Sequence, residues 1–252
     1  MRYFIRFAYL GTDFHGSQTQ PNASSVQQTM EEAMATILRT PTPLTFAGRT
    51  DAGVHARCMW AHFDAEQALP DNLTHRLNAL LPESIALYDI VRVCADAHAR
   101  FDATSRTYRY YITTRKDPFA YRTRTRVAPG LDFEAMNRAA ELLRGRQDFA
   151  SFCRIHTDVK TTICDVREAY WTRENECEAY FTITADRFLR NMVRAVVGTL
   201  FDVGRGKLSP EQFLAIIHAQ SRASAGQSAD ARGLFLEQIQ YPATIFAPFS
   251  TK

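Results

Sequence analysis

The sequence predicts an α+β protein built from two similar halves, residues 1–97 and 98–252. The 252 residues are enough for one large core or for two domains of common size. In each half, short segments rich in aromatic and β-branched residues alternate with amphipathic helical segments. The order in both is strand, helix, strands, helix, strand, which is the split β-α-β arrangement. We therefore expect a duplicated ferredoxin-like architecture whose sheets join into one extended, mostly antiparallel sheet, with a central cleft.

The first half begins with a strand at residues 3–10, where YFIRFAYL is short and rich in strand-forming residues. A helix follows between Ser25 and Pro41, and Ser25 and Gln28 have the spacing of a capping box. Hydrophobic spacing then predicts strands on both sides of a break within 44–65, a helix at 71–81 and a strand at 85–93.

The second half repeats this order. Its predicted elements are a strand at 106–114, a helix at 132–145, a hairpin of strands at 161–172 and 177–185, helices at 188–204 and 209–219, and a closing strand at 233–241. Ser209, Pro210 and Gln212 predict a capped start for the last helix. Residues 221–233 have low complexity and predict a mobile surface loop.

Composition indicates a soluble, reduced, cytoplasmic protein. Hydrophobic residues make up 46% and charged residues 23%, and no window approaches the length of a membrane span. The first ten residues include Arg2 and Arg6, unlike a signal peptide. The five cysteines are widely spaced and form no C-x-x-C pair, which predicts neither a zinc site nor a disulfide framework.

Basic residues concentrate in one segment. Residues 100–126 contain eight basic side chains against two aspartates, with six aromatic residues among them. Cations for phosphates beside rings for bases are typical of proteins that bind single-stranded or looped RNA. A solvated strand face has the same mixture, so this alternative stays open. If the segment binds RNA, Arg122 and Arg124 are its candidate phosphate contacts.

Asp51 lies in the stretch FAGRTDAGVHA, between small residues that leave room for a bulky ligand. An isolated aspartate in such a loop is commonly a turn residue. A metal site is a further alternative, since Asp51, His55, His62 and Asp64 are suitable ligands, but they form no compact ligand motif. The chain has no nucleophile elbow and no phosphate-binding loop of the G-x-x-x-x-G-K type.

The chain resembles the tRNA pseudouridine synthase A family, which acts on the anticodon stem-loop. The central match is the unbroken GRTDAGVHA at residues 48–56. Further matching segments are YLGTDFHGSQTQPN at 9–22, HARFDATSRTYRYYI at 98–112, DFASFC at 148–153, FLRNMVRAVVGTLFDVGRGKLSP at 188–210 and GLFLEQIQY at 233–241. Met59 departs from the pattern, because the family is expected to have glutamine there.

The resemblance implies an isomerase that converts uridine to pseudouridine at positions 38, 39 and 40 of tRNA. It implies that Asp51 is the catalytic carboxylate, acting as nucleophile or base, and that Arg194 is its basic partner. Tyr108 would stack on the extruded uracil, and Arg49 would help to extrude the base or hold its phosphate. The resemblance implies that the protein needs neither a metal nor an organic cofactor. It also implies that the central cleft binds RNA and that the protein is a homodimer.

Two other functions compete with this interpretation. A non-catalytic RNA-binding module could use the same arginine and tyrosine surface, but it has no use for an acid that faces a phosphate chain. A glycoside or ester hydrolase with an aspartate nucleophile would ordinarily need a second carboxylate, and none is evident in these segments.

Overall fold

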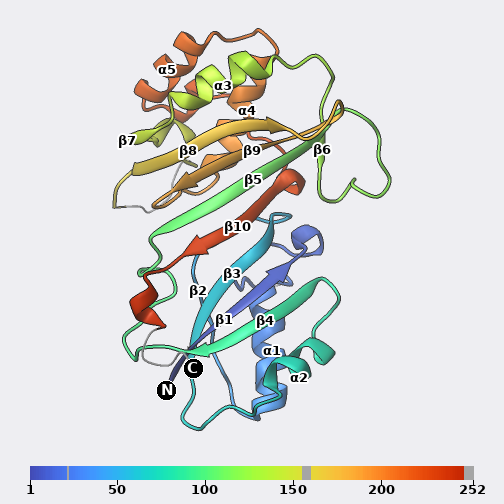
Figure 1. Cartoon of the computed structure of the whole chain (residues 1–252), viewed down its shortest axis with the longest axis vertical. Coiled ribbons are helices and arrows are strands. Elements are labelled where there is room, and N and C mark those ends of the chain that lie inside the picture. The colour runs from blue at the N-terminus through green and yellow to red at the C-terminus, as the bar shows by residue number, and fades with distance from the viewer. Residues whose placement is uncertain (22, 155–159, 247–252) are drawn as a thin grey trace. The chain divides into compact units, whose positions relative to one another are not determined.

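The structure is a computed structural model of the chain, and it describes residues 1–21, 23–154 and 160–246. Asn22, the last residue of the family-like segment 9–22, lies outside the described part. The described residues form five α-helices and ten strands, and the strand pairs are mostly antiparallel (Figure 1). The predicted α+β class is therefore confirmed, while the cleft between the halves remains a prediction.

The chain divides into two compact units. Unit 1 comprises residues 1–104 and 236–252, and unit 2 comprises residues 105–235. The units differ from the predicted halves 1–97 and 98–252 in two respects, since residues 98–104 and the segment from Leu236 both belong to the first unit.

Unit 1 contains a sheet with the order β4-β1-β3-β10, in which β2 pairs with β3. Its elements are β1 (Arg2–Tyr9), α1 (Val26–Leu38), β2 (Thr45–Phe46), β3 (His55–Asp64), α2 (Leu73–Leu80), β4 (Ile85–Arg92) and, from Leu236 onward, β10 (Leu234–Gln240). Helices α1 and α2 contact each other and lie on the same face of this sheet (Figure 1). Between them and the sheet, side chains such as Phe7, Met30 and Met59 are fully or almost fully buried.

Unit 2 contains a sheet with the order β5-β9-β8-β7, in which β6 pairs with β5. Its elements are β5 (Ser105–Thr113), β6 (Thr125–Arg126), α3 (Phe133–Glu141), β7 (Gly145–Asp148), β8 (Ile163–Arg173), β9 (Glu178–Ala185), α4 (Met192–Gly204) and α5 (Pro210–His218). The three helices pack on one another, and α3 packs on β8. Trp171 joins sheet and helices, with its ring centroid 5.3 Å from that of Phe181 and 5.8 Å from that of Phe201.

The same connectivity occurs in both units. In unit 1, a helix follows β1, and β1 then pairs with β3, the strand that follows β2. In unit 2, α3 follows β5, and β5 pairs with β9, the strand that follows β8. This agreement supports the predicted duplication.

Three local predictions need correction. Helix α4 begins at Met192 rather than near residue 188. The preceding residue, Asn191, has a left-handed φ of 66°, which cannot be part of a continuous right-handed helix. Only half of the first capping box forms: Ser25 accepts the Gln28 amide at 3.2 Å, but the Gln28 side chain donates to Glu32. The short strand β7 was not expected.

No helix in the described ranges has both the length and the apolar character needed to cross a membrane.

Candidate active site

Asp51 lies in the loop of residues 47–54, between the antiparallel strands β2 and β3. The Val54 amide donates to the Asp51 carbonyl at 3.1 Å, which closes a turn over residues 51–54. Gly53, the third residue of this turn, has a φ of 76°. Glycine takes this conformation without steric cost, which explains the glycine two residues after the aspartate.

Segment 9–17 holds this loop through Thr50, the residue before Asp51. The Thr50 amide donates to Ser17 Oγ at 2.9 Å, and the Thr50 carbonyl accepts from the Ser17 amide at 3.2 Å. The Thr50 and Tyr9 hydroxyls are hydrogen bonded at 2.8 Å. Thr50 is only 3% exposed and Ser17 is fully buried, so these bonds are protected from water. They fix the backbone on the N-terminal side of Asp51.

Two glycines let segment 9–17 approach the loop closely. A Cβ on Gly11 would lie 2.0 Å from the Val54 carbonyl oxygen, and one on Gly16 would lie 2.9 Å from that of Thr50. The Gly11 amide donates to Nδ1 of the buried His55 at 2.9 Å. His55 therefore fixes the C-terminal side of the loop.

In unit 2, Tyr108 and Tyr110 lie on the same face of β5, since they are two residues apart in a strand. The Tyr108 ring meets Phe188 edge to face, with centroids 5.0 Å apart. Tyr110 is fully buried, and its hydroxyl donates to the Asp230 carbonyl at 2.8 Å. Burial raises the pKa of Tyr110 well above its usual value, so Tyr110 stays protonated.

Arg194 lies in the first turn of α4. Its Nε donates to the Ala229 carbonyl at 2.7 Å, and the Ala229 amide donates back to the Arg194 carbonyl at 2.9 Å. Burial alone would raise the pKa of the neighbouring Asp230, but hydrogen bonds from Arg232 and the charges of Arg232 and Arg194 lower it overall. Arg194 and Arg232 thus both act on the Asp230 carboxylate beside the N-terminal turn of α4.

Comparisons with known proteins agree with the motif. The family model for tRNA pseudouridine synthase matches residues 139–242. The tRNA pseudouridine synthase A of Bacteroides fragilis is 55% identical over 247 residues, 97% of this chain and 98% of that protein. Its counterpart in Porphyromonas gingivalis is also 55% identical, over 97% of this chain and 99% of that protein. The chain belongs to the tRNA pseudouridine synthase A family. More distant members match as well: the protein of Caldicellulosiruptor bescii is 41% identical over 94% of this chain and 98% of its own length.

The four residues that the family resemblance assigns to the site are divided between the units. Asp51 and the exposed Arg49 belong to unit 1, whereas Tyr108 and Arg194 belong to unit 2. Within unit 2, Tyr108 lies on the same strand face as Tyr110, and the Tyr110 hydroxyl donates to the Asp230 carbonyl. The residue before Asp230, Ala229, accepts the hydrogen bond from Arg194. The assembly of all four into one site of this family remains a prediction.

Met59, the departure from the family pattern, is fully buried on β3 opposite Phe7. An apolar side chain packs there without an unsatisfied polar group.

The side chains considered as metal ligands have other partners. His55 Nδ1 accepts from Gly11, and His62 Nδ1 accepts from the Ala99 amide at 3.2 Å. The Asp64 carboxylate pairs with Arg2 through two bonds of 2.8 and 3.0 Å. Among the residues that the structure describes, no three His, Cys, Asp or Glu side chains gather as a metal site would require.

Sequence reasoning missed the residues that support the candidate catalytic groups. Ser17 and Gly11 lie in a family segment, but their contacts with the Asp51 loop depend on distant parts of the chain meeting. Residues 225–230 were included in a predicted mobile loop, yet hydrogen bonds hold them against α4. Their small side chains, which suggested mobility, are what allow close contact with the helix.

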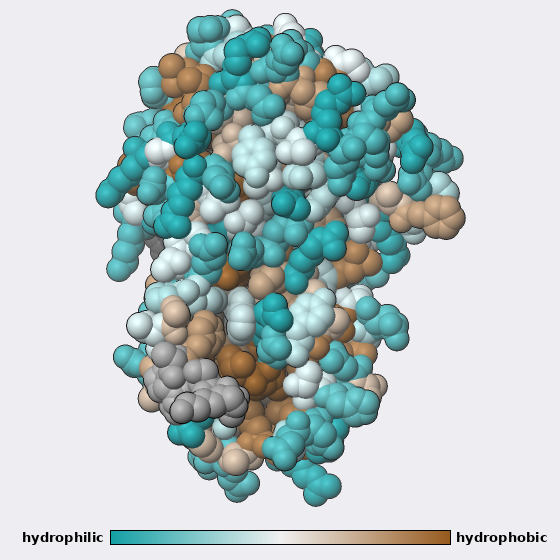
Figure 2. Space-filling model, viewed as in Figure 1, coloured by the Kyte–Doolittle hydropathy of each residue, from teal (hydrophilic) through white to brown (hydrophobic). Residues whose placement is uncertain are grey.

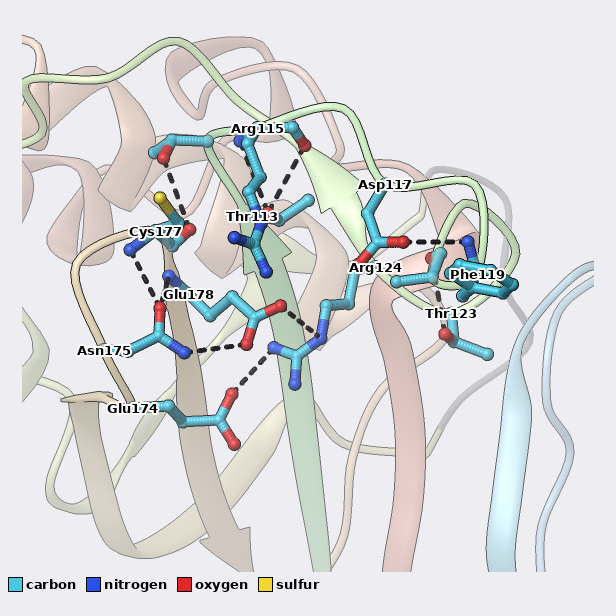
Figure 3. Close-up of polar contacts among 12 residues, drawn as sticks. Thr113, Arg115, Asp117, Phe119, Thr123, Arg124, Glu174, Asn175, Cys177 and Glu178 are labelled. Carbon is cyan, nitrogen blue, oxygen red and sulfur yellow. Dashed lines mark hydrogen bonds and ion pairs between the residues drawn. The ribbon is translucent and has the colours of Figure 1, made fainter.

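The basic segment needs one correction. Arg124 pairs with Glu174 at 2.7 Å and lies 3.8 Å from Glu178, with the two carboxylates on either side of its guanidinium (Figure 3). Its side chain is 19% exposed and its guanidinium lies 5.3 Å from the centre of the Tyr111 ring. Arg124 therefore has a structural role within unit 2 and is not a candidate phosphate contact.

Other residues of this segment are exposed. Phe119 is 95% exposed in the middle of the loop between β5 and β6, and its amide donates to the Asp117 carboxylate at 2.8 Å (Figure 3). Tyr121 is 59% exposed, and the Arg122 guanidinium lies 5.9 Å from its ring. Over β5, β8 and β9, Figure 2 shows mostly hydrophilic and neutral residues. These surfaces suit a polar partner better than an apolar one.

Proposed function

We propose that this chain isomerises uridine to pseudouridine in the anticodon stem-loop of tRNA, at positions 38, 39 and 40. The observation that carries the proposal is Asp51, in an unbroken GRTDAGVHA motif that is held on both sides of Asp51 by buried hydrogen bonds, from Thr50 to Ser17 and from Gly11 to His55. Such support is what a preorganised catalytic carboxylate requires.

The chemistry needs a single carboxylate. The N1–C1′ bond of the uridine breaks, the uracil turns while it stays bound, and a C5–C1′ bond forms as C5 loses its proton and N1 gains one. Asp51 either adds to C1′ and leaves again when C5 attacks, or removes a proton from the neighbouring sugar carbon and returns it when the C5–C1′ bond forms. Glycosidases use two carboxylates because they also protonate a leaving group and activate water. Here no water is consumed and no oxidation state changes.

The other proposed site residues assist this step. Arg194 would pair with Asp51 and hold it ionised and oriented, because a charge-assisted bond from an arginine favours the carboxylate form. Tyr108 would stack on the flipped uracil. Arg49, exposed two residues before Asp51, would help to extrude the base or bind its phosphate.

The proposed tRNA surface includes the exposed part of residues 100–126. The exposed Phe119 and Tyr121 offer rings for unpaired bases. The exposed Arg115 and Lys116, together with the partly exposed Arg122, offer cations for phosphates. We further propose that the protein is a cytoplasmic homodimer. The composition indicates the cytoplasmic location, and the family resemblance implies the dimer.

The test uses tRNA labelled with tritium at uridine C5, since only isomerisation at C5 releases the label. The wild-type chain should release tritium, and Asp51→Asn should release none while it binds tRNA as tightly. The amide is nearly isosteric, so folding should survive, but it serves neither as nucleophile nor as base. Asp71→Asn, at an exposed position before α2, is the matched control and should retain full activity.

Turnover by a clean Asp51→Asn preparation would contradict the role of Asp51. Tight tRNA binding by the wild-type chain without any tritium release would instead favour the competing function, a non-catalytic RNA-binding module.

A further inference from the structure

Residues 225–230, which we call the α4 strap, run along α4 in close contact with it. A Cβ on Gly198 would lie 1.8 Å from the Gln227 carbonyl oxygen, so only glycine at this helix position permits the approach. The Gly226 amide donates to Thr199 Oγ1 at 2.9 Å, and Thr199 is fully buried. The strap is therefore docked on the helix through specific contacts.

The strap contacts Arg194 through Ala229. The Ala229 carbonyl accepts the Nε hydrogen at 2.7 Å, while the Ala229 amide binds the Arg194 backbone at 2.9 Å. Ala229 is buried, so water competes poorly for these bonds. A guanidinium whose Nε is bound in this way pairs with a carboxylate through its two terminal nitrogens, in an end-on geometry.

Ser228 anchors the strap next to Ala229. Its Oγ accepts from Asn191 Nδ2 at 2.7 Å and from Arg222 at 3.1 Å. Arg222 also donates to the carbonyls of Ala225 and Gly226, at 3.2 and 3.1 Å. Asn191 is the residue before the first turn of α4, so Ser228 ties the strap to the helix start where Arg194 lies.

We propose that the α4 strap is a positioning element for Arg194, and that Ser228 is its positioning residue. The strap fixes the guanidinium through the Ala229 carbonyl, so that its terminal nitrogens are oriented before the substrate binds. This inference rests on the proposed function, because it assumes that Arg194 pairs with Asp51. Ser228 itself touches no reacting atom in this account.

The experiment compares three variants by single-turnover rate and by tRNA dissociation constant. Ser228→Ala removes both anchoring bonds, and loss of such bonds should lower the rate about tenfold while the dissociation constant stays within about twofold. Ser228→Thr keeps the hydroxyl and should restore most of the rate. Ser224→Ala removes an exposed hydroxyl outside the strap and should behave as wild type. A normal rate for Ser228→Ala would overturn the proposal.

A double-mutant cycle separates positioning from general stability. Arg194→Lys lacks the Nε donor and the second terminal nitrogen. In that background Ser228→Ala should cause little further loss if the strap acts through Arg194, whereas a full tenfold further loss would overturn the inference. A normal rate for Arg194→Lys would contradict the proposed pairing of Arg194 with Asp51, whereas absence of tritium release by the wild-type chain would contradict the proposed function itself. A damaged Arg194→Lys beside a normal Ser228→Ala would overturn only the role of the strap.

Discussion

At the scale of single residues, the two tyrosines on one face of β5 illustrate how position decides role. Tyr110 is fully buried, and its hydroxyl contacts both the Asp230 carbonyl and Thr125 at 2.8 Å. It is a core residue with a satisfied polar group. Tyr108 is only partly buried and presents its ring to Phe188. The same residue type therefore serves the core at one position and is a candidate for base stacking two residues away.

We expect Tyr108→Leu to lose most activity, because a lost base-stacking contact is worth about 1–3 kcal/mol. Tyr108→Phe should retain stacking, and its difference from wild type would measure the contribution of the hydroxyl. Both variants are to be assayed by single-turnover tritium release.

The matched control is Tyr110→Phe. It should lower the free energy of unfolding by about 0.5–1.5 kcal/mol, because the part-buried hydrogen bonds of the Tyr110 hydroxyl to Thr125 and to the Asp230 carbonyl are lost. Full activity of Tyr108→Leu would remove Tyr108 from the proposed site.

At the scale of elements, the Asp51 loop depends on a segment that is some forty residues earlier in the chain. Buried hydrogen bonds join Thr50 to Ser17 and His55 to Gly11. The strands β2 and β3 only determine where the loop begins and ends. The conformation of residues 50–54 comes from its packing against residues 9–17.

Gly11→Ala should therefore disturb the loop, since the added Cβ would lie 2.0 Å from the Val54 carbonyl oxygen. We expect a lower melting temperature and a large loss of turnover, as strain here is transmitted to the backbone beside Asp51. Gly48→Ala is the control for stability, because a Cβ there meets nothing within 4 Å and its φ is not positive. Equal melting temperatures for the two variants would contradict this account.

At the scale of the whole molecule, the basic residues of the segment 100–126 have two different roles, in stability and in tRNA binding. Arg122 is partly exposed beside the exposed Tyr121, whereas Arg124 is paired with Glu174 and Glu178. We expect Arg122→Ala to weaken tRNA binding and to reduce the slope of log K against log salt by about 0.7–0.9, the value of one phosphate contact.

Arg124→Ala should act mainly on stability, because it leaves two partly buried carboxylates without their cation. We expect a loss of about 1–2 kcal/mol in the free energy of unfolding, which is less than for a fully buried pair. Its salt dependence of binding should match that of wild type. The opposite assignment, with Arg124→Ala changing the salt slope and Arg122→Ala changing stability, would show that we have exchanged the two roles.

Stability should also depend on pH through His62. Burial lowers its pKa to about 4, and the positive charges of His98 and Arg2 act in the same direction. In the unfolded chain the pKa is about 6.5, so the unfolded state binds more protons between these values. Stability should therefore fall as the pH drops from about 6.5 towards 4. The urea midpoint of wild type should decrease in this window, and that of His62→Asn should decrease less; parallel curves would argue against His62.

The sequence by itself determined the elements and the family. Alternation of apolar residues, the Ser209 cap and the GRTDAGVHA motif depend on residues that are close along the chain, so local pattern was sufficient to predict them. Tertiary structure decided which side chains support the site. Ser17, which binds Thr50, Ala229, which binds Arg194, and Glu174, which pairs with Arg124, each lie far from their partner in the sequence. Small or polar residues give no signal of such contacts in the sequence. Residues 225–230 differ from the predicted mobile loop for the same reason. Their glycine and alanine content indicates flexibility in an isolated chain, but it allows close packing where a helix lies against them.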